Sequence, residues 1–407
     1  MRCFFRSTLL LLSSAAVVAG NATSNAMDAH VKDMVAWLRE QGGYFNENLQ
    51  IRRADPSDPT SYFGVLSTAS IPSMEPLMSI PAFSIIRAIQ PKHDSDNWED
   101  SNAVLCDLTH VLLKELQLGE KSHFAPYVKY LLGQERGQIP ATWTEPAKEL
   151  LRKIESPFAN KLELTDWIET SFEQDYIEPE NVFEQQALAM VVQHGWDSVF
   201  IPIYDMLNHV NDEEKLNMDN NSVYSAEGLH VWASKAIEAG EEIFLTYNNC
   251  SDSQDTPYDW GTTEILRDFG FVELYPQKFT FLWGEEQIVV AIDEKDDDGE
   301  TYMYIEWLGF GESPTYEQIE WMEEEYERLM DLQHSGVLAE RRGLMPEKEW
   351  NTIFQYHQAL VTALEGAIYI AIHELNALED EDDSGYDEDG DGNCAASMDP
   401  VVYEDLK

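Results

Sequence analysis

Three short segments between residues 205 and 271 carry the side chains best suited to chemistry. Asn208 and His209 follow an apolar run, Tyr247 closes a segment of alternating polarity, and Phe269 and Phe271 flank a glycine. A tyrosine at the end of a buried strand has a stiff ring and a hydroxyl at a fixed distance from the backbone, so it can orient a reacting group. The plainer alternative is a core tyrosine with a satisfied hydroxyl, and an Asn-His pair in a polar turn.

Other common catalytic patterns are missing from the sequence. It contains no Gly-x-Ser-x-Gly elbow, no P-loop and no His-Glu-x-x-His, since His373-Glu374 has no second histidine. Its four cysteines are scattered, which argues against a disulfide framework and a structural zinc cluster. We therefore expect no metal site.

The order of the three segments resembles a known family. Asp205-Met206-Leu207-Asn208-His209, then residues 240–247, then Phe269-Gly270-Phe271 are similar to the SET-domain protein methyltransferases. The branch that they resemble is typified by the Rubisco large-subunit methyltransferase, and the likeness covers roughly residues 43–276. The resemblance implies transfer of a methyl group from S-adenosylmethionine (SAM) to a nitrogen of a protein side chain.

The resemblance also implies a role for each residue. It makes Tyr247 the catalytic tyrosine, gives contact with SAM to Asn208 and His209, and places Phe269 and Phe271 in the wall of the amine channel. Such a displacement needs an amine placed behind the methyl group and water excluded. Aromatic faces also favour a cationic methylammonium product.

The N-terminal part of the resemblance is reduced. Family members carry a Gly-x-Gly or Gly-Arg-Gly turn whose backbone meets the methionine part of SAM, whereas here Gly64 remains, preceded by Phe63. The resemblance therefore places Phe63 and Gly64 at the cofactor. Where relatives tend to have an arginine before the Asn-His strand, this chain reads Gln193-His194.

Hydrophobic periodicity predicts an α+β fold. Alternating residues predict strands over 62–67, 76–81, 199–203, 229–232 and 242–247, with a strand pair within 279–292. Apolar residues at helical spacing predict helices over 28–41, within 103–190, over 262–268 and beyond residue 314. The resemblance adds SET-domain β-sheets with a knot-like crossing.

The same patterns divide the chain into four parts. We expect a signal peptide over residues 1–20 and a SET domain over 28–280 that a helical insertion interrupts at about 103–190. A mostly helical C-terminal domain over 281–378 and an acidic, disordered tail over 379–407 follow. Basic Arg2 and Arg6 before two apolar runs support the signal peptide. Entry into the secretory pathway would lead to a lumen, to secretion, or to a plastid reached through the secretory route.

The net charge of −50 limits the partners. The acidic tail contributes −11, so −39 stays on the rest of the chain. Such a surface repels phosphate backbones and attracts basic proteins, although it could equally serve solubility. We expect a monomer that binds no nucleic acid and no membrane, and a protein substrate with a basic target loop.

Three functions stay open at this point. The leading one is SAM-dependent protein-lysine methylation, and histidine methylation is a variant that relatives of this branch use. The third is a catalytically silent SET-fold protein that binds basic partners through its acidic surface.

Overall fold

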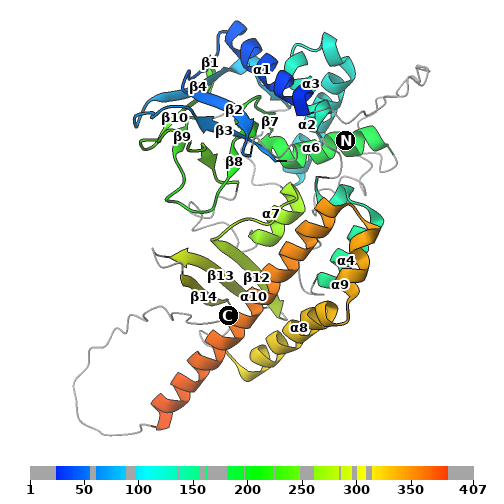
Figure 1. The fold of residues 1–407 in the computed structure, drawn as a ribbon, viewed down its shortest axis with the longest axis vertical. Coiled ribbons are helices and arrows are strands. Elements are labelled where there is room, and N and C mark those ends of the chain that lie inside the picture. The colour runs from blue at the N-terminus through cyan, green and yellow to red at the C-terminus, as the bar shows by residue number, and fades with distance from the viewer. Residues whose placement is uncertain are drawn as a thin grey trace.

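Two hydrophobic cores, one above the other, organise the chain in a computed structural model (Figure 1). The structure describes residues 24–55, 61–88, 98–134, 138–155, 162, 181–196, 198–222, 225–247, 261–283, 286–295, 300–308 and 314–383. The expected signal peptide lies outside these residues. Among the helices that they form, none is both long and apolar enough to cross a membrane.

The upper unit is built from short strands. They form small sheets in the orders β1-β4-β10-β9, β2-β3, β5-β7-β6 and β8-β11. Their bounds are β1 Tyr44–Phe45, β2 Leu49–Arg53, β3 Phe63–Ser67, β4 Pro76–Pro81, β5 Ile86–Arg87, β6 Gly195–Trp196, β7 Val199–Phe200, β8 Asn208–His209, β9 Met218–Asn220, β10 Gly228–Ala233 and β11 Phe244–Leu245. The strands predicted from alternation are confirmed as β3, β4, β7, β10 and β11, of which β3, β7 and β11 are shorter than predicted.

Strands β8 and β11 are the one parallel pair in these sheets, within the described residues. A parallel pair requires the chain to cross over between its strands, and here the crossover runs through β9 and β10. This is as much of the expected knot-like crossing as the described residues contain. The pairing brings segments some forty residues apart into direct register.

Four helices cover the upper core (Figure 1). They are α1 Ser24–Glu40, α2 Trp98–Leu118, α3 Ala125–Gly133 and α6 Val182–His194, with α1 packed against α3 and α2 against α6. Helix α1 buries Val31, Met34 and Leu38, which recur at helical spacing on one face. It confirms the helix predicted over residues 28–41.

The lower unit combines a sheet with helices. The antiparallel strands are β12 Gln277–Trp283, β13 Glu286–Lys295 and β14 Glu300–Leu308, and the helices are α7 Thr262–Phe269, α8 Tyr316–His334, α9 Val337–Arg341 and α10 Glu347–Asp383. Short 3-10 turns occur along the described chain in both units: η1 Ala82–Ser84, η2 Gly119–Lys121, η3 Pro140–Thr142, η4 Tyr204–Met206 and η5 Arg342–Leu344.

Helices form most of residues 281–378, as expected, but a sheet precedes them. The strand pair predicted within 279–292 is present, but a third strand, β14, joins it. Ile288, Val290 and Ile292 alternate along β13 and are buried in the lower core, which α10 also lines. The boundary expected after residue 280 falls inside β12, and α10 extends to Asp383, into the segment expected to be disordered.

The helical insertion is shared between the two cores. Helices α2, α3 and α6 pack on the upper core, whereas α4, Glu145–Ile154, buries Ala147, Leu150 and Leu151 in the lower one. A sequence shows that a helix has an apolar stripe, but the stripe does not reveal which core receives it.

Candidate functional site

The strand pair β8-β11 brings the predicted site residues together. Asn208 lies opposite Phe244 and His209 opposite Leu245, and Tyr247 follows two residues beyond the end of β11. The backbone N–H of Tyr247 donates to His209 Nδ1 at 3.0 Å, and its hydroxyl donates to the Leu207 carbonyl at 2.9 Å. Tyr247 is therefore fixed at both ends by the segment that carries the Asn-His pair.

Aromatic rings surround the Tyr247 phenol. Its ring centroid lies 4.5 Å from that of Phe269, 5.1 Å from that of His209 and 6.5 Å from that of Phe271. Burial raises the pKa of Tyr247, and the charges of Asp205 and Glu242 raise it further. The phenol therefore stays neutral and can donate or accept a hydrogen bond, but it is a poor proton acceptor.

Two hydrogen bonds fix the tautomer of His209, and one of them is to Glu273. Because His209 Nδ1 accepts from the Tyr247 backbone, its proton is on Nε2, which donates to Glu273 Oε2 at 2.9 Å. Asn211 Nδ2 and Thr262 Oγ1 also donate to the Glu273 carboxylate, each at 2.6 Å. The carboxylate is thus held by three donors at a side chain that is 2% exposed.

The sequence analysis missed Glu273. Its one signal was an acidic residue inside the apolar run Phe271-Val272-Glu273-Leu274. An acid is seldom buried without partners, so such a position points to a specific network. The partners themselves lie 11 to 64 residues away, where no local pattern could reveal them.

Replacing Glu273 by glutamine is expected to lower the free energy of unfolding by about 1–3 kcal/mol. The amide group would put two hydrogens where the carboxylate accepts, so a buried donor loses its partner. Urea unfolding measures the change, and Glu213→Gln makes the same substitution at an exposed position. Equal stability of the Glu273 variant and the wild type would contradict the network.

Helix α7 sets the position of Phe269 and of Phe271, which follows it. It begins with Glu264 Oε2 accepting from the Gly261 N–H at 2.8 Å, and its Ile265 and Leu266 are buried. It ends at Gly270, whose φ of +78° favours glycine. Thr263 Oγ1 also lies 2.9 Å from the Tyr356 hydroxyl of α10, which ties α7 to the lower core.

Gly270→Ala is expected to lower the free energy of unfolding by about 2–4 kcal/mol. A Cβ there would lie 1.7 Å from the Gln138 carbonyl oxygen, and the positive φ adds strain. The matched control is Gly336→Ala, where φ is +80° but no atom lies within 4 Å, so only the strain of about 1 kcal/mol applies. Equal losses for the two variants in urea unfolding would contradict close contact at Gly270.

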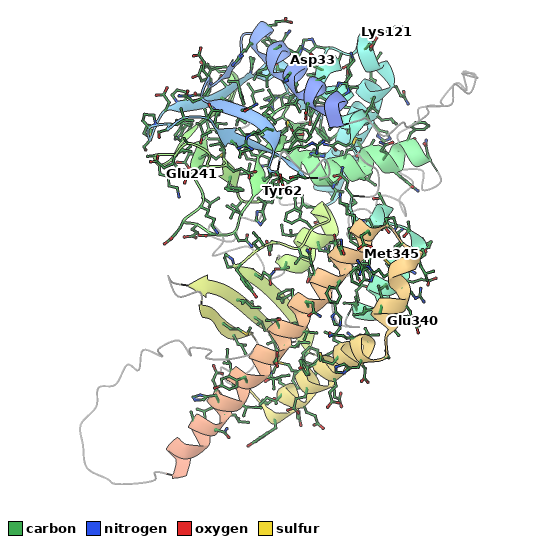
Figure 2. The ribbon with its side chains drawn as sticks, in the orientation of Figure 1. Asp33, Tyr62, Lys121, Glu241, Glu340 and Met345 are labelled. Carbon is green, nitrogen blue, oxygen red and sulfur yellow. The ribbon has the colours of Figure 1, made fainter. Side chains whose placement is uncertain are left out.

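On the other side of β8, Asn208 meets Phe63 and Gly64. Asn208 Nδ2 donates to the Phe63 carbonyl at 2.9 Å and to Glu242 Oε1 at 2.5 Å. A Cβ on Gly64 would lie 2.1 Å from Glu242 Oε1 and 3.0 Å from Asn208 Nδ2, so a side chain there would displace the Glu242 carboxylate. In Figure 2, Tyr62 lies along the lower edge of the upper unit.

The Asn-His pair therefore serves two neighbouring clusters. Successive side chains of a strand point to opposite faces, so Asn208 faces Phe63 and Gly64 while His209 faces Tyr247 and Glu273. Phe269 and Phe271 join the His209 side. All seven residues predicted for the site thus lie around one two-residue strand.

A buried acid lies close to this site. Asp205 Oδ2 accepts from the Tyr127 hydroxyl at 2.5 Å and lies 3.5 Å from His194 Nδ1, while Asp205 Oδ1 and His194 Nδ1 have no hydrogen-bond partner. Burial raises the pKa of Asp205 to about 7 and lowers the pKa of His194 to about 4. The cluster therefore has more acceptors than donors.

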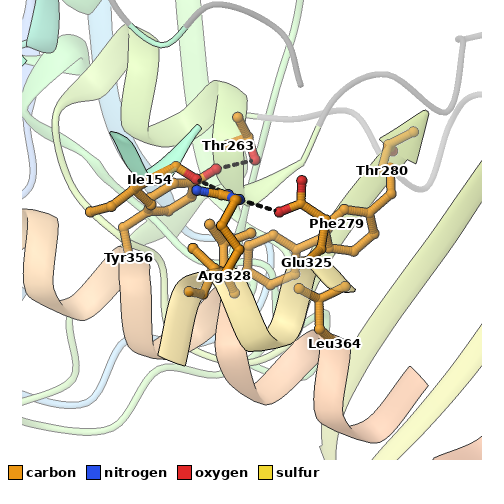
Figure 3. A pocket seen from close by; sticks show the side chains of 11 residues that line it. Ile154, Thr263, Phe279, Thr280, Glu325, Arg328, Tyr356 and Leu364 are labelled. Atoms are coloured by element: carbon orange, nitrogen blue, oxygen red, sulfur yellow. Dashed lines mark hydrogen bonds and ion pairs between the residues drawn. The ribbon is translucent and has the colours of Figure 1, made fainter. Parts of the chain in front are cut away.

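The cavity in Figure 3 is separate from this site. It lies in the lower core beside Thr263, Tyr356 and Arg328, and its volume of about 20 Å³ has room for no more than one water molecule. Arg328 donates to the Ile154 carbonyl at 2.9 Å and to Glu325 at 2.5 Å. The cavity is a packing feature of the lower core rather than a substrate site.

Comparison with known proteins identifies the upper unit. The family model of the SET domain matches residues 62–248, a span that includes Phe63, Gly64, Asn208, His209 and Tyr247. No curated protein sequence matches the chain significantly.

Solved structures similar to this one include the SET domain of LSMT bound to lysine and AdoHcy. It has a TM-score of 0.48 and 12% identity over 86% of this chain and 93% of that chain. Rubisco LSMT bound to sinefungin and monomethyllysine has a TM-score of 0.48 and 13% identity over the same shares. The family match confirms the SET interpretation made from the motifs. The chain therefore contains a SET domain, which spans residues 62–248.

Proposed function

We propose that this protein transfers a methyl group from SAM to a side-chain nitrogen of a protein, and that the target is lysine. One observation carries the proposal. Tyr247, Asn208 and His209 meet at the β8-β11 pair inside the matched SET domain, with Phe269 against the tyrosine ring. This is the combination of a polar cofactor side and an aromatic channel side that the reaction needs.

The residues around Gly64 fit the cofactor. Gly64 has no side chain, so groups can approach its backbone closely, as the Glu242 carboxylate does, and the Asn208 amide lies at the same place. Phe63, Gly64, Asn208 and the backbone near His209 would hold SAM, which supplies an electrophilic methyl group on a sulfonium.

The channel residues fit the amine. Tyr247 is kept neutral by burial and by nearby carboxylates, so its hydroxyl orients the amine by hydrogen bonding. Leu207 and His209 hold the tyrosine in place, and Phe269 and Phe271 exclude water from around it. The amine must arrive without its extra proton, because only a free lone pair can attack the methyl group.

The acidity of the surface supports a basic protein substrate. Helix α8 exposes Glu317, Glu320, Glu323, Glu324 and Glu327. Salt screens such charges, so raising the ionic strength from about 0.05 M to 0.3 M is expected to raise KM several-fold and leave kcat unchanged. A KM that does not respond to salt would indicate that the acidity serves solubility.

Tritiated-methyl transfer tests the function. The full chain is incubated with tritiated SAM and whole-cell protein, the labelled protein is hydrolysed, and the methylated amino acid is identified. Tritium in methyl-lysine supports the proposal, and tritium in methyl-histidine moves the target to histidine. If no tritium is transferred and calorimetry shows no heat of SAM binding, the remaining interpretation is a catalytically silent SET-fold protein.

A further inference from the structure

Two charged side chains lie on the same face of the β2-β3 hairpin as the space above Gly64. Arg52 in β2 is directly opposite Gly64 in β3, and side chains of opposite residues share a face. Glu242 Oε1 enters that face, since it lies 2.1 Å from the position that a Gly64 Cβ would take. The Arg52 charge also acts on Glu242, whose pKa it lowers against a larger, opposite effect of burial. The cation Arg52 and the anion Glu242 therefore lie on the same face of the hairpin, next to Gly64.

The Glu242 carboxylate is held in a defined position. Asn208 Nδ2 donates to Oε1 at 2.5 Å, and the Tyr62 hydroxyl lies 3.4 Å from Oε2. The residue is half-buried, and burial raises its pKa above the usual value. Its neighbour Glu241 is exposed instead. A carboxylate kept partly out of water beside an amide is suited to bind a cationic group.

The neighbouring cation is engaged elsewhere. Arg53 Nη1 donates to the Ser61 carbonyl at 2.6 Å, and its guanidinium lies 4.4 Å from the centroid of the Phe63 ring. Burial lowers the pKa of His194 to about 4, so that side chain is uncharged near neutral pH. Arg52, opposite Gly64, is the cation on the Gly64 face. Its Nη1 donates to the Arg53 carbonyl at 3.2 Å, and a guanidinium has five N–H donors, so a ligand carboxylate can still bind to the others.

We propose that Glu242 and Arg52 together bind the amino-acid end of SAM, with Glu242 receiving the α-ammonium group and Arg52 the α-carboxylate. The inference rests on the proposed function. The amino-acid end carries one positive and one negative group on a single carbon, so it matches a carboxylate and a guanidinium on one face. Asn208 orients the Glu242 oxygen, and the missing side chain of Gly64 leaves the space that the Glu242 carboxylate and the Asn208 amide occupy.

Calorimetry with two ligands tests the proposal without any turnover. S-adenosylhomocysteine has the amino-acid end, whereas 5′-methylthioadenosine has the same nucleoside and thioether but lacks that end. Glu242→Gln and Arg52→Gln in the full chain are each expected to weaken S-adenosylhomocysteine binding by about 10- to 100-fold. Binding of 5′-methylthioadenosine is expected to change less than about twofold, because that ligand has no charge for either residue to meet.

Glu241→Gln is the matched control. It removes the same charge one residue away at an exposed position, so neither affinity should change. Urea unfolding of each variant shows whether the fold is retained. The glutamine at position 242 keeps an oxygen for Asn208, so a loss of affinity with unchanged stability reports the missing charge.

The outcomes separate the inference from the function. Unchanged S-adenosylhomocysteine binding by Glu242→Gln, or an equal loss for both ligands, would overturn the assignment of Glu242 while leaving the methyltransferase proposal in place. A wild-type protein that binds neither ligand would overturn both. Selective loss of S-adenosylhomocysteine binding in both variants supports the paired site.

Discussion

Tyr247→Phe is expected to lower the rate of methyl transfer by about 10²- to 10³-fold, the usual effect of removing one preorganised hydrogen-bonding group from an active site. The phenylalanine ring keeps the contacts with Phe269 and His209, so only the hydroxyl and its bond to the Leu207 carbonyl are lost. The amine would then enter without a fixed orientation. Single-turnover transfer of a tritiated methyl group measures the loss.

Tyr204→Phe provides the control for this substitution. Tyr204 is also buried, and its hydroxyl accepts from Asn220 Nδ2 at 3.1 Å. Tyr204→Phe therefore also removes one buried hydroxyl, and we expect it to change the rate of methyl transfer by no more than a few-fold. Affinity for S-adenosylhomocysteine should be the same in Tyr247→Phe as in the wild type, because Asn208 and Gly64 face the other side of β8. Equal rates for Tyr247→Phe and wild type would remove Tyr247 from the mechanism.

Asp205→Asn is expected to raise the free energy of unfolding by about 2–4 kcal/mol at pH 8 and to leave it nearly unchanged below pH 4. Burial raises the pKa of Asp205 from 3.8 to about 7. Between these values the folded protein keeps a proton that the unfolded chain has released. Wild-type stability therefore falls as the pH rises from 4 to 7, and the asparagine variant escapes this loss.

The groups that face Asp205 do not change the sign of this difference. His194 has its pKa lowered to about 4, so it makes the protein less stable as the pH falls from 6.5 to 4, but it is present in both proteins. Burial raises the pKa values of Tyr127, Tyr130 and Tyr247, so they stay neutral over this range. The asparagine amide can also donate to His194 Nδ1, which has no partner in the wild type.

Urea unfolding at pH 4, 6 and 8 measures the prediction. The exposed Asp219→Asn serves as the control, since it removes the same charge from the surface. A variant whose stability follows that of the wild type from pH 4 to pH 8 would show that Asp205 ionises normally. The destabilising charge lies next to Tyr247, where it also disfavours the phenolate.

The long elements were predictable because their signal is local. Met34 and Leu38 recur at helical spacing in α1, and Ile319 and Met322 do so in α8. Periodicity of this kind follows from the geometry of a helix with one buried face. It therefore appears in the sequence before any tertiary contact is known.

The two-residue strands were harder to predict. β8 and β11 are defined by pairing with each other rather than by local propensity, and the sequence predicted a strand of six residues where Phe244–Leu245 forms. Their site residues were found through the spacing of motifs that resemble a family. Tyr247 was placed at the strand end and lies two residues beyond it.

Residues that act through distant contacts were missed. Glu273 reaches His209 across 64 residues, and Arg52 shares a face with Gly64 only through the register of a hairpin. Neither position belongs to a motif or a periodic run. The same reason explains why the partner of α4 was not predicted, since an apolar stripe is compatible with either core.

Helix α7 makes the two units thermodynamically dependent on each other. It contacts the insertion through Gly270 and α10 through Thr263. Its Thr262 donates to Glu273, which in turn accepts from His209 of the SET domain. A loss of packing at α10 is therefore expected to shift the aromatic rings around Tyr247. A fragment that ends after the SET match would lack the helix that carries Phe269, so the proposed reaction would require both units.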